Sequence, residues 1–364
     1  MVNNLKFNIN NRFNPNLMSI SIEKVPFGKL PDGRTADLYR MTNESGAVAE
    51  VTNWGGRLVR ILVPNKDGVL TSVIKGYDTL ESFLTDTCYL GATCGRYANR
   101  IAKGKFFADG DEFTLACNNG PNALHGGIDG FQLQLWDAKI ERESLILSHL
   151  SPDGHEGYPG NLKVEVEFSW SETNELSMEV TANTDKATPV NITNHAYFNL
   201  NGEGDILGHQ LRINAAKYIP IHSDAIPTGE IRFVEGTPFD FQEAKLIGRD
   251  IEAGGEQLTA GAGFDHCFVL NKEEFDDLVM AADAFAPESG IGLRLYTTMP
   301  GVQFYSGNYL GSEVPGLYGQ SYEPRQAFCL EPEFFPDSPN QSGFPRAILL
   351  PQETYRHTLI FQFY

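Results

Sequence analysis

The sequence predicts an all-β protein that folds as one large antiparallel β domain, and three observations support this prediction. From Ile20 onward, short segments that alternate apolar and polar residues recur, separated by clusters of turn-forming residues. The 364 residues include 36 glycines, 20 prolines and 11% aromatic residues, a composition typical of many strands joined by tight turns. Stretches with helical periodicity are few and short, and no internal repeat is visible.

The predicted domain covers residues 19–364 and follows a polar N-terminal extension. Residues 1–18 are rich in asparagine and contain no apolar stretch of the kind found in signal peptides. Met18 offers an alternative start, which the intact mass of the native protein would reveal. All-β domains often exceed the usual domain length, so we expect the rest of the chain to form one domain rather than two.

The clearest predicted element is a β-hairpin over residues 162–182. In LKVEVEFSW (162–170) every second residue is apolar, and LSMEVTA (176–182) repeats the alternation after the turn ETNE. Two later segments, GLRLYTTMPGVQFYSGNYL (292–310) and HTLIFQFY (357–364), are also predicted to form strands. The most helix-like stretch is KEEFDDLVMAADAF (272–285), for which we expect a helix of a turn or two.

The charge of the chain argues against several classes of partner. Asp and Glu number 47 against 28 Lys and Arg, which gives a formal net charge of −19. Binding to nucleic acid or to anionic lipid depends on clustered Lys and Arg, so we expect no nucleic acid and no membrane as partner. No stretch approaches the ~20 apolar residues of a membrane-spanning helix. The negative net charge neither attracts nor repels an uncharged small molecule, which is therefore the expected ligand.

The cysteines and histidines predict neither a disulfide framework nor a zinc site. The five cysteines are odd in number and widely spaced, without a C-x-x-C pair: Cys88, Cys94, Cys117, Cys267 and Cys329. From this cysteine pattern we expect reduced thiols in a cytosolic protein. The eight histidines show no H-E-x-x-H or other zinc-ligand spacing, so we expect no metal ion. The sequence also lacks a G-x-S-x-G elbow, a G-x-x-x-x-G-K-[ST] loop and a helix-opening G-x-G-x-x-G motif, so we expect no organic cofactor.

Two glycine-rich segments in the first half of the chain carry candidate ligand-binding side chains. GATCGRYANRIAKGKF holds Arg96 and Arg100 beside Asn99, and each arginine either satisfies loop carbonyls or binds a ligand oxygen. NNGPNALHGGIDGFQLQLW contains His125, and the two glycines after it let the backbone come close to its surroundings. Taken alone, this histidine is either a satisfied loop residue or a ligand contact.

The segment TPVNITNHAYFNLNG (188–202) is predicted to form a strand with one polar face. With a period of two, Asn191, Thr193, His195 and Tyr197 fall on the same face. An amide, a hydroxyl, an imidazole and a phenol in a row, without Lys or Glu, favour a polar cleft over a solvated surface. His195 is therefore the leading candidate for a functional histidine.

Two later segments place carboxylates next to apolar strands. Asp265 in GAGFDHCFVL either caps the strand that follows it or accepts hydrogen bonds from ligand hydroxyl groups. Glu331 in AFCLEPEFFPDSPNQSGFP ends an apolar run among phenylalanines, and burial there would raise the pKa of its carboxyl group and make it a better base. On these grounds Glu333 and Asp337 compete with Glu331 for the same role.

Taken in order, these segments resemble the galactose mutarotase (aldose 1-epimerase) family. The resemblance covers about residues 50–364 and rests on the motifs GRYANRI, LHGG, TNHAYFNLNG, YIPIHSDAIPTGEI, GTPFDF, GFDH, GVQFYSGN and CLEPEFFPDSPN. Any one of these motifs is modest, but the whole set in the family's order is highly specific. The resemblance implies a single β-sandwich domain of the galactose mutarotase (supersandwich) type, with a sugar cleft on one sheet. It also implies an isomerase that needs neither a metal ion nor an organic cofactor.

The resemblance further implies roles for individual side chains. Glu331 matches the family's catalytic base, and His195 matches its general acid. The family's substrate contacts match Asn99, Arg100, His125, Asp265 and Gln303. The chain departs from the family at Pro332 and Glu333, where relatives usually carry Thr or Ser followed by Gln, and at Tyr97, where a small aliphatic residue is common.

The implied reaction opens the sugar hemiacetal and closes it again on the other face of C1. A base removes the C1 hydroxyl proton while an acid protonates the ring oxygen, and the two groups exchange roles on closure. An unperturbed histidine is mostly neutral at pH 7, so we expect a nearby carboxylate, with Asp265 as a contributor, to raise the pKa of His195. The expected substrates are free aldohexoses such as galactose and glucose, and the expected protein is a monomer or a weak dimer.

Three other functions stay open on these grounds. A hexose-6-phosphate 1-epimerase would need a cationic phosphate-binding cluster, and a non-catalytic carbohydrate-binding protein would need no acid and base pair. A glycoside hydrolase or lyase on a similar sandwich would act on oligosaccharides. Mutarotation assays over free and phosphorylated hexoses distinguish these functions.

Overall fold

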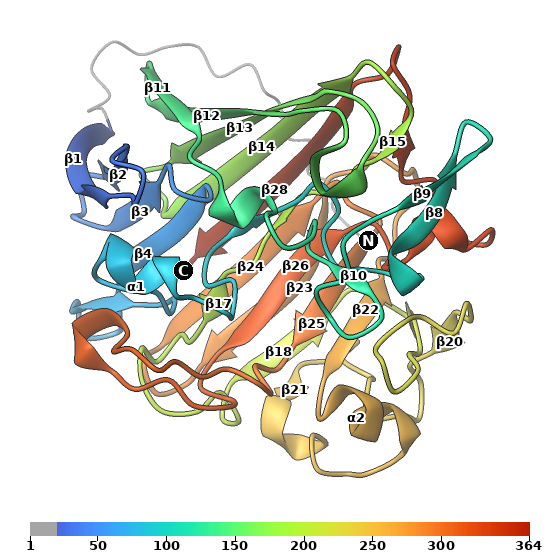
Figure 1. Ribbon diagram of the computed structural model, residues 1–364. Helices are drawn as coiled ribbons and strands as arrows, with labels where there is room; N and C mark the ends of the chain where they lie inside the picture. The colour runs from blue at the N-terminus through green and yellow to red at the C-terminus, as the bar shows by residue number, and fades with distance from the viewer. Residues whose placement is uncertain (1–19) are drawn as a thin grey trace.

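The computed structural model describes residues 20–364, and the predicted extension over residues 1–18 lies outside the described residues. Antiparallel β-strands form nearly all of the regular structure in this part of the chain, as predicted, and three sheets dominate it (Figure 1). Two short α-helices interrupt the strands, α1 (Leu80–Leu84) and α2 (Glu256–Gly261). Thr79 begins α1 by accepting a hydrogen bond from Ser82 N at its side-chain oxygen.

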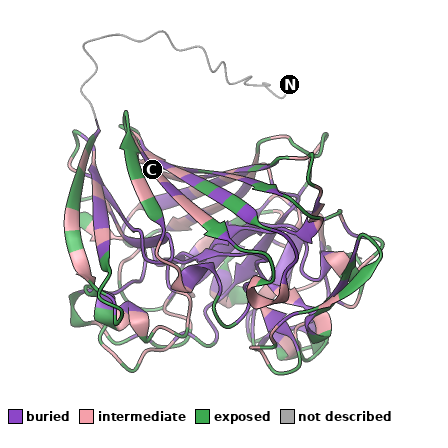
Figure 2. Cartoon of the chain, turned by 45° about the horizontal axis from the view of Figure 1, so that its top comes forward, coloured by how far each residue is buried: buried purple, intermediate pink, exposed green. Residues whose placement is uncertain are grey.

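The largest sheet has nine strands, and its middle strand comes from the C-terminal end of the chain. In spatial order the strands are β11 (Asp137–Glu141), β12 (Ser144–Ser151), β13 (Leu162–Trp170), β14 (Glu175–Thr184), β28 (Tyr355–Phe363), β24 (Ile291–Thr297), β23 (Val279–Ala286), β18 (Gln210–Ile213) and β21 (Lys245–Leu246). The predicted hairpin is formed by β13 and β14, and its register runs from Leu162 opposite Thr184 to Trp170 opposite Leu176. Figure 2 shows buried and exposed residues alternating along these strands, because one face of the sheet covers the core.

A six-stranded sheet packs against the nine-stranded sheet and carries the site described below. Its strands, in spatial order, are β17 (Tyr197–Phe198), β26 (Phe328–Glu333), β25 (Gly301–Tyr305), β22 (Asp265–Val269), β19 (Lys217–Tyr218) and β20 (Arg232–Phe233). The ring of Phe198 lies 5.2 Å from that of Phe361 in β28, centroid to centroid, so the two sheets meet through aromatic side chains. Phe328 and Leu330 belong to this shared core. Residues alternate along a strand, so Glu331 faces the opposite way.

A five-stranded sheet and several short strand pairs complete the architecture. The sheet consists of β1 (Ser21–Lys29), β2 (Thr35–Thr42), β3 (Val48–Thr52), β4 (Arg57–Pro64) and β5 (Leu70–Ser72). The pairs are β6 (Thr93–Cys94) with β16 (Thr193–Asn194), β7 (Arg100–Ile101) with β10 (Ala123–Leu124), β8 (Lys105–Ala108) with β9 (Asp111–Thr114), and β15 (Thr188–Pro189) with β27 (Ile348–Leu349). The stacked sheets confirm the predicted β-sandwich.

Two predictions for local structure were wrong or only partly right. The segment 272–285 forms turns followed by strand β23 instead of a helix, because Ala282 and Ala284 are buried on either side of the half-buried Asp283. Pairing with β24 and β18 on both sides then outweighs the helix propensity of alanine. The segment 188–202 is divided among β15, β16 and β17 rather than forming one strand.

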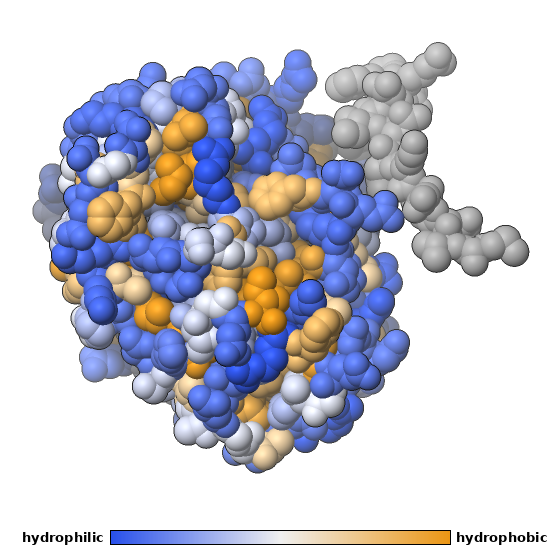
Figure 3. Space-filling view, turned by 90° about the vertical axis from the view of Figure 1, so that its right-hand side faces the viewer, coloured by the Kyte–Doolittle hydropathy of each residue, from blue (hydrophilic) through white to orange (hydrophobic). Residues whose placement is uncertain are grey.

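The two predicted strands near the C-terminal end are confirmed. The segment 292–310 contains most of β24 and all of β25, and the segment 357–364 contains most of β28. No helix within residues 20–364 is long and apolar enough to cross a membrane. The surface in Figure 3 is mostly hydrophilic and is interrupted by a few apolar patches.

Candidate active site

Three neighbouring strands of the six-stranded sheet place polar side chains on the face that points away from the core. Glu331 of β26 lies opposite Gln303 of β25, and Gln303 lies opposite Cys267 of β22. Asp265 comes two residues before Cys267 and therefore shares its face. The strand register thus brings Asp265, Gln303 and Glu331 together from segments that are far apart in the sequence.

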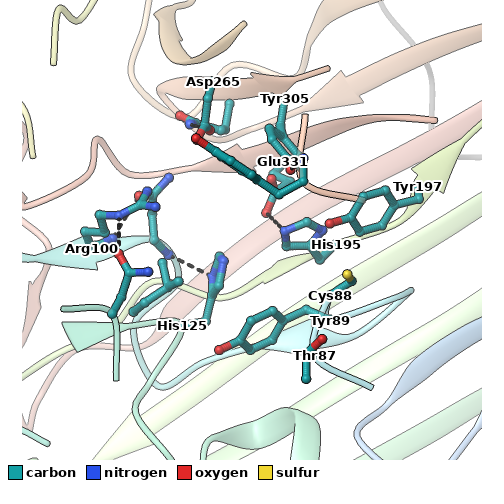
Figure 4. A pocket seen from close by; sticks show the side chains of 15 residues that line it. Thr87, Cys88, Tyr89, Arg100, His125, His195, Tyr197, Asp265, Tyr305 and Glu331 are labelled. Carbon is teal, nitrogen blue, oxygen red and sulfur yellow. Dashed lines mark hydrogen bonds and ion pairs between the residues drawn. The ribbon is translucent and has the colours of Figure 1, made fainter. Parts of the chain in front are cut away.

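His195 reaches this face from the loop between β16 and β17. Its backbone is held on both sides, because His195 N donates to Ala92 O at 2.8 Å and Gly91 N donates to His195 O at 3.0 Å. The imidazole Nε2 lies 3.7 Å from Glu331 Oε2 (Figure 4), and Nδ1 lies 3.5 Å from Cys329 Sγ. The carboxyl and imidazole groups that the sequence singles out as base and acid are therefore neighbours.

His125 lies beside His195, with ring centroids 5.2 Å apart, and Asn99 fixes its orientation. His125 N donates to Asn99 O at 3.1 Å, and Asn99 N donates to His125 Nδ1 at 3.1 Å. Burial lowers the pKa of His125 well below its ordinary value, so the ring is neutral and carries its proton on Nε2. Gly126, with φ of +92°, packs against the carbonyl of Gly95, where a Cβ atom would have no room.

His125, His195 and Glu331 also form the kind of group that can hold a metal ion. One ligand atom from each lies within 4.8 Å of the others. The hydrogen bond from Asn99 N to His125 Nδ1 leaves the ring proton on Nε2, whereas a metal ion needs an unprotonated nitrogen. This bond favours His125 as a hydrogen-bond donor to a ligand over His125 as a metal ligand.

The two candidate arginines have different surroundings. Arg96 is buried and donates to four backbone carbonyl oxygens within residues 151–160, so it satisfies loop carbonyls. Arg100 lines the pocket, and its Nε donates to Asn119 Oδ1 at 3.0 Å. Arg96 therefore stabilises a loop, whereas Arg100 lies where its guanidinium can bind a ligand oxygen.

Hydrogen bonds hold both the side chain and the backbone of Asp265 in place. Its Oδ1 accepts a hydrogen bond from Gln303 Nε2 at 2.7 Å. Its backbone N–H donates to His266 Nδ1 at 3.2 Å, and His266 Nε2 lies 3.2 Å from Gln257 Oε1, so the buried His266 holds the start of β22 in place. Burial raises the pKa of the Asp265 carboxyl group, and the Arg100 guanidinium opposes this effect.

The structure distinguishes Glu331 from Glu333 and Asp337, the two other candidates for the base, and it shows where the side chain of Tyr97 lies. Glu331 lines the pocket, whereas Glu333 is fully buried outside the pocket lining. Asp337 accepts hydrogen bonds from Ala102 N at 2.9 Å and from two nearby amide side chains, so it stabilises a turn. Tyr97 is also buried outside the pocket lining, where its hydroxyl donates to Phe335 O at 3.1 Å.

These side chains surround a pocket of about 280 Å³. In Figure 4, Glu331 and His195 lie on one side, Arg100 and His125 lie across from them, and Asp265 lies between the two groups. The volume is close to the lower end of the ~300–1,000 Å³ usual for ligand pockets, which suits one monosaccharide. Every residue to which the resemblance assigns a role lines the pocket: Asn99, Arg100, His125, His195, Asp265, Gln303 and Glu331.

Sequence reasoning missed several aromatic and small side chains in the lining. Thr87, Cys88 and Tyr89 reach the pocket from the loop after α1, and Tyr305 and Tyr309 reach it from β25 and the loop after it. The ring centroid of Tyr89 lies 4.7 Å from that of His125 and 6.1 Å from that of His195. Tyr305 could have been found, because it lies two residues after Gln303 on the same strand. No motif marks the loop that carries Tyr89.

Burial dominates the electrostatics of the acid and base candidates. Burial and the nearby Asp265 raise the pKa of the Glu331 carboxyl group well above its ordinary value, while Arg100 lowers it. The expected rise in the pKa of this carboxyl group is therefore confirmed. The aromatic rings that line the pocket with it are tyrosines rather than the neighbouring phenylalanines.

The expected rise in the pKa of His195 was wrong. Burial lowers the pKa of His195 to about 4. The rings of Tyr89, Tyr197 and Tyr305 surround the imidazole at centroid distances of 6.1, 4.9 and 6.4 Å, and they exclude the water that would stabilise an imidazolium. Asp265, which was expected to contribute to the rise, accepts a hydrogen bond from Gln303 instead.

Comparison with known proteins identifies similar sequences over nearly the whole chain. Residues 37–362 match the family model described as aldose 1-epimerase. The chain is 40% identical over 347 residues to a galactose mutarotase from Bos taurus, covering 94% of this chain and 99% of the relative. It is 40% identical to the galactose mutarotase of Homo sapiens over 94% of this chain and 98% of that protein. It is 38% identical to the aldose 1-epimerase of Escherichia coli (strain K12) over 92% of this chain and 96% of that protein.

Solved structures show the same fold. An aldose epimerase homologue from C. elegans superposes with a TM-score of 0.83 at 28% identity, covering 95% of this chain and 99% of that chain. A galactose 1-epimerase from Lactobacillus acidophilus NCFM superposes with a TM-score of 0.82, also at 28% identity and with the same coverage.

Proposed function

Since this chain belongs to the aldose 1-epimerase family and is a mutarotase, we propose that Glu331 and His195 carry the two proton transfers of its reaction. The observation that carries this proposal is the 3.7 Å contact between Glu331 Oε2 and His195 Nε2 at the wall of the pocket. Within residues 20–364, Glu331 Oε2 is buried without a hydrogen-bond partner, so its lone pairs are available to a sugar.

Anomer exchange needs an acid and a base close together. The hemiacetal opens when a proton leaves the C1 hydroxyl group and another is added to the ring oxygen. Both oxygens are bonded to C1, so the two catalytic groups must approach from neighbouring directions. Glu331 removes the hydroxyl proton and His195 protonates the ring oxygen, and the two reverse these roles after rotation about C1–C2. Each transfer contributes a factor of roughly 10² to 10⁴ to the rate.

The pair has to hold one proton between its two members. Ionised Glu331 with protonated His195, and protonated Glu331 with neutral His195, contain the same number of protons and differ by one transfer between Oε2 and Nε2. The pKa directions favour the second distribution, which is also the one that ring opening leaves behind. Hydrogen bonds from sugar hydroxyls to Glu331, together with Arg100, favour the first one.

We propose that the other polar residues of the pocket hold the ring hydroxyls while C1 stays free to turn. His125 Nε2 and the Arg100 guanidinium offer donors, and the Asp265 carboxylate offers acceptors. Gln303 Oε1 is buried without a partner in the described part of the chain, so it can accept one more hydrogen bond. The side-chain amide of Asn99 lies beside them in the pocket lining. A neutral polyol offers no charge to bind, so such donors and acceptors determine its orientation.

The charges of the pocket favour a free aldohexose over a hexose 6-phosphate. Of the described residues that line the pocket, Arg100 alone carries a fixed positive charge, and Asp265 and Glu331 are acidic. A phosphate group needs a cluster of cationic donors. A non-catalytic binding protein, in turn, needs no carboxyl and imidazole groups in contact. We therefore propose free galactose and glucose as substrates.

Polarimetry of freshly dissolved α-D-glucose and α-D-galactose tests the acid and base assignment. Glu331→Gln and His195→Asn should each lower the enzymatic mutarotation rate at least about 100-fold, because each removes one proton transfer. Asp337→Asn is the matched control, since Asp337 is a buried carboxyl group outside the pocket lining, and it should retain most of the activity. Glu331 is not the base if Glu331→Gln keeps a nearly wild-type rate, and an unchanged rate for His195→Asn refutes the acid. A faster reaction with hexose 6-phosphates would reassign the substrate.

We also propose that the enzyme acts in cytosolic hexose metabolism as a monomer or a weak dimer. All five cysteines are free, which agrees with a reducing compartment. Sedimentation equilibrium over a range of protein concentrations tests the oligomeric state. A tight tetramer would contradict the proposal.

A further inference from the structure

Glu333 is a buried carboxyl group that the proposed reaction does not use. It lies two residues after Glu331 on the same face of β26, and its side chain has no exposed surface. Its Oε1 accepts a hydrogen bond from Asn99 Nδ2 at 3.0 Å. Its Oε2 is buried and has no partner among residues 20–364. The carboxyl group is therefore next to the site without lining it.

Asn99 connects Glu333 to two residues that do line the pocket. Its φ of +62° is in the left-handed region, which asparagine tolerates better than most residues. Its side-chain Oδ1 accepts from Arg100 N at 2.8 Å, and its backbone N–H donates to His125 Nδ1 at 3.1 Å. With its Nδ2 bonded to Glu333, Asn99 is anchored to β26 on one side and orients Arg100 and His125 on the other.

We propose that Glu333 is a positioning residue for the substrate-binding side of the pocket and that it acts as a neutral hydrogen-bond acceptor. This inference rests on the proposed function, in which Arg100 and His125 bind sugar hydroxyls. Without the acceptor, Asn99 Nδ2 would be buried with no partner, and the left-handed turn at Asn99 would lose its attachment to the sheet. His125 and Arg100 would then no longer point at the same place.

The surroundings of Glu333 favour its protonated form. Burial and the nearby Glu331 raise the pKa of its carboxyl group well above the ordinary value, while the Asn99 hydrogen bond and Arg100 lower it. An ionised carboxylate with a buried, unpartnered oxygen is strongly disfavoured. A charge on Glu333 would also oppose the ionisation that Glu331 needs as a base. The remaining titratable groups around it are acidic or neutral: Asp265, Cys94, Cys267, Tyr97 and Tyr355.

Two substitutions of Glu333 show whether its role depends on accepting a hydrogen bond or on carrying a charge. Glu333→Gln keeps a neutral oxygen for Asn99 Nδ2, and Glu333→Leu removes it at a similar size. Initial mutarotation rates at pH 7 over a range of sugar concentrations should show a KM about tenfold higher for Glu333→Leu, with kcat within about threefold of wild type. Contacts that are equal in the ground state and the transition state change KM and leave kcat. For Glu333→Gln both constants should stay within about twofold of the wild-type values.

A reversed hydrogen bond provides a second test in case Glu333→Leu folds poorly. Asn99→Asp keeps an oxygen for Arg100 N but replaces the neutral amide donor by a second carboxyl group, which places a buried charge or a shared proton between positions 99 and 333, so its KM should rise. Adding Glu333→Gln supplies a donor from the other side, so the double variant should recover most of that rise. Thermal unfolding of each variant shows whether the fold is intact.

Specific results would overturn the positioning role. It fails if Glu333→Leu and Glu333→Gln have the same KM, whether both are normal or both are raised, and it fails if the double variant recovers nothing. A Glu331→Gln variant that keeps full activity while Glu333→Leu raises KM would instead reject Glu331 as the base and leave the positioning role in place.

Discussion

Replacing Asp86 by alanine should destabilise the protein through the loss of one buried ion pair. Arg57 Nη1 donates to Asp86 Oδ2 at 2.8 Å, and the two side chains are 1% and 0% exposed. Asp86 also accepts hydrogen bonds from Cys88 N at 3.1 Å and from Leu90 N at 3.0 Å. Asp86→Ala leaves a buried guanidinium without its counter-ion, which costs about 3–5 kcal/mol of unfolding free energy.

The expected change in melting temperature follows from the size of the chain. Unfolding entropy is about 2.1 cal/mol/K per residue, which for 364 residues multiplies to about 0.76 kcal/mol/K. Dividing the loss of about 3–5 kcal/mol by this value predicts that Tm falls by about 4–7 °C. The segment that Asp86 holds carries Thr87, Cys88 and Tyr89 into the pocket, so KM should also rise at temperatures well below Tm.

Circular dichroism melts at pH 7 and polarimetric kinetics at 25 °C measure both effects. Glu141→Ala is the control, because Glu141 pairs with Lys139 on the surface, where the side chains are 52% and 66% exposed. This control should leave Tm unchanged within experimental error, since exposed pairs are screened by solvent. If Asp86→Ala also melts within about 1 °C of wild type, the buried pair contributes no more to stability than an exposed one.

Three further predictions concern pH and backbone geometry. Burial lowers the pKa of His357 to about 3, below the ~6.5 of an unfolded chain, so the unfolded state binds more protons between these values and stability falls as pH drops through this window. In circular dichroism melts, the Tm of His357→Gln should therefore fall less between pH 7 and pH 4 than that of wild type. An equal fall of Tm with pH in both proteins would contradict this. The charge of Asp265 raises the pKa of Glu331, so Asp265→Asn should move the acidic limb of the kcat/KM profile to lower pH, and a limb that stays in place would refute the coupling. Gly126→Ala should destabilise the fold by about 1–3 kcal/mol and raise KM, because its Cβ meets the Gly95 carbonyl at φ +92°. Gly110→Ala, at φ +89° with open space around it, should cost less in a denaturant titration, and equal costs would show that the clash is unimportant.

The strands and the pocket residues were the parts most readily predicted from the sequence. In β13 and β14 one side of the sheet covers the core and the other is more polar. The alternation of residues such as Val164 and Glu165 therefore shows to which side of the sheet each side chain points. The pocket residues were identified from ordered motifs instead. Periodicity alone left Glu331, Glu333 and Asp337 equivalent, because all three follow the same apolar run. Their difference lies in which neighbour each carboxyl group meets in the folded chain.

The parts that were missed depend on contacts between distant segments. The low pKa of His195 comes from rings contributed by Tyr89, Tyr197 and Tyr305, and neither Tyr89 nor Tyr305 is near His195 in the sequence. The segment 188–202 was predicted as one strand with a polar face, but Asn191 and Thr193 are as buried as their apolar neighbours. A pattern of polar and apolar residues cannot distinguish a side chain that lines a cleft from one that bonds to a neighbouring loop. Asn191 bonds to the backbone of Phe334 in this way.

The central place of β28 in the nine-stranded sheet affects how the protein is made. Figure 1 shows this strand, drawn in red near the end of the colour scale, beside the green β14, and on its other side it pairs with β24. Ribosomal synthesis proceeds from the N-terminus, so β14 and β24 both emerge before the strand that joins them. During this interval their inner edges have no partner and are open to pairing with other chains. We expect newly made chains to depend on chaperones until β28 is released, and circular permutants that begin with β28 to depend on them less.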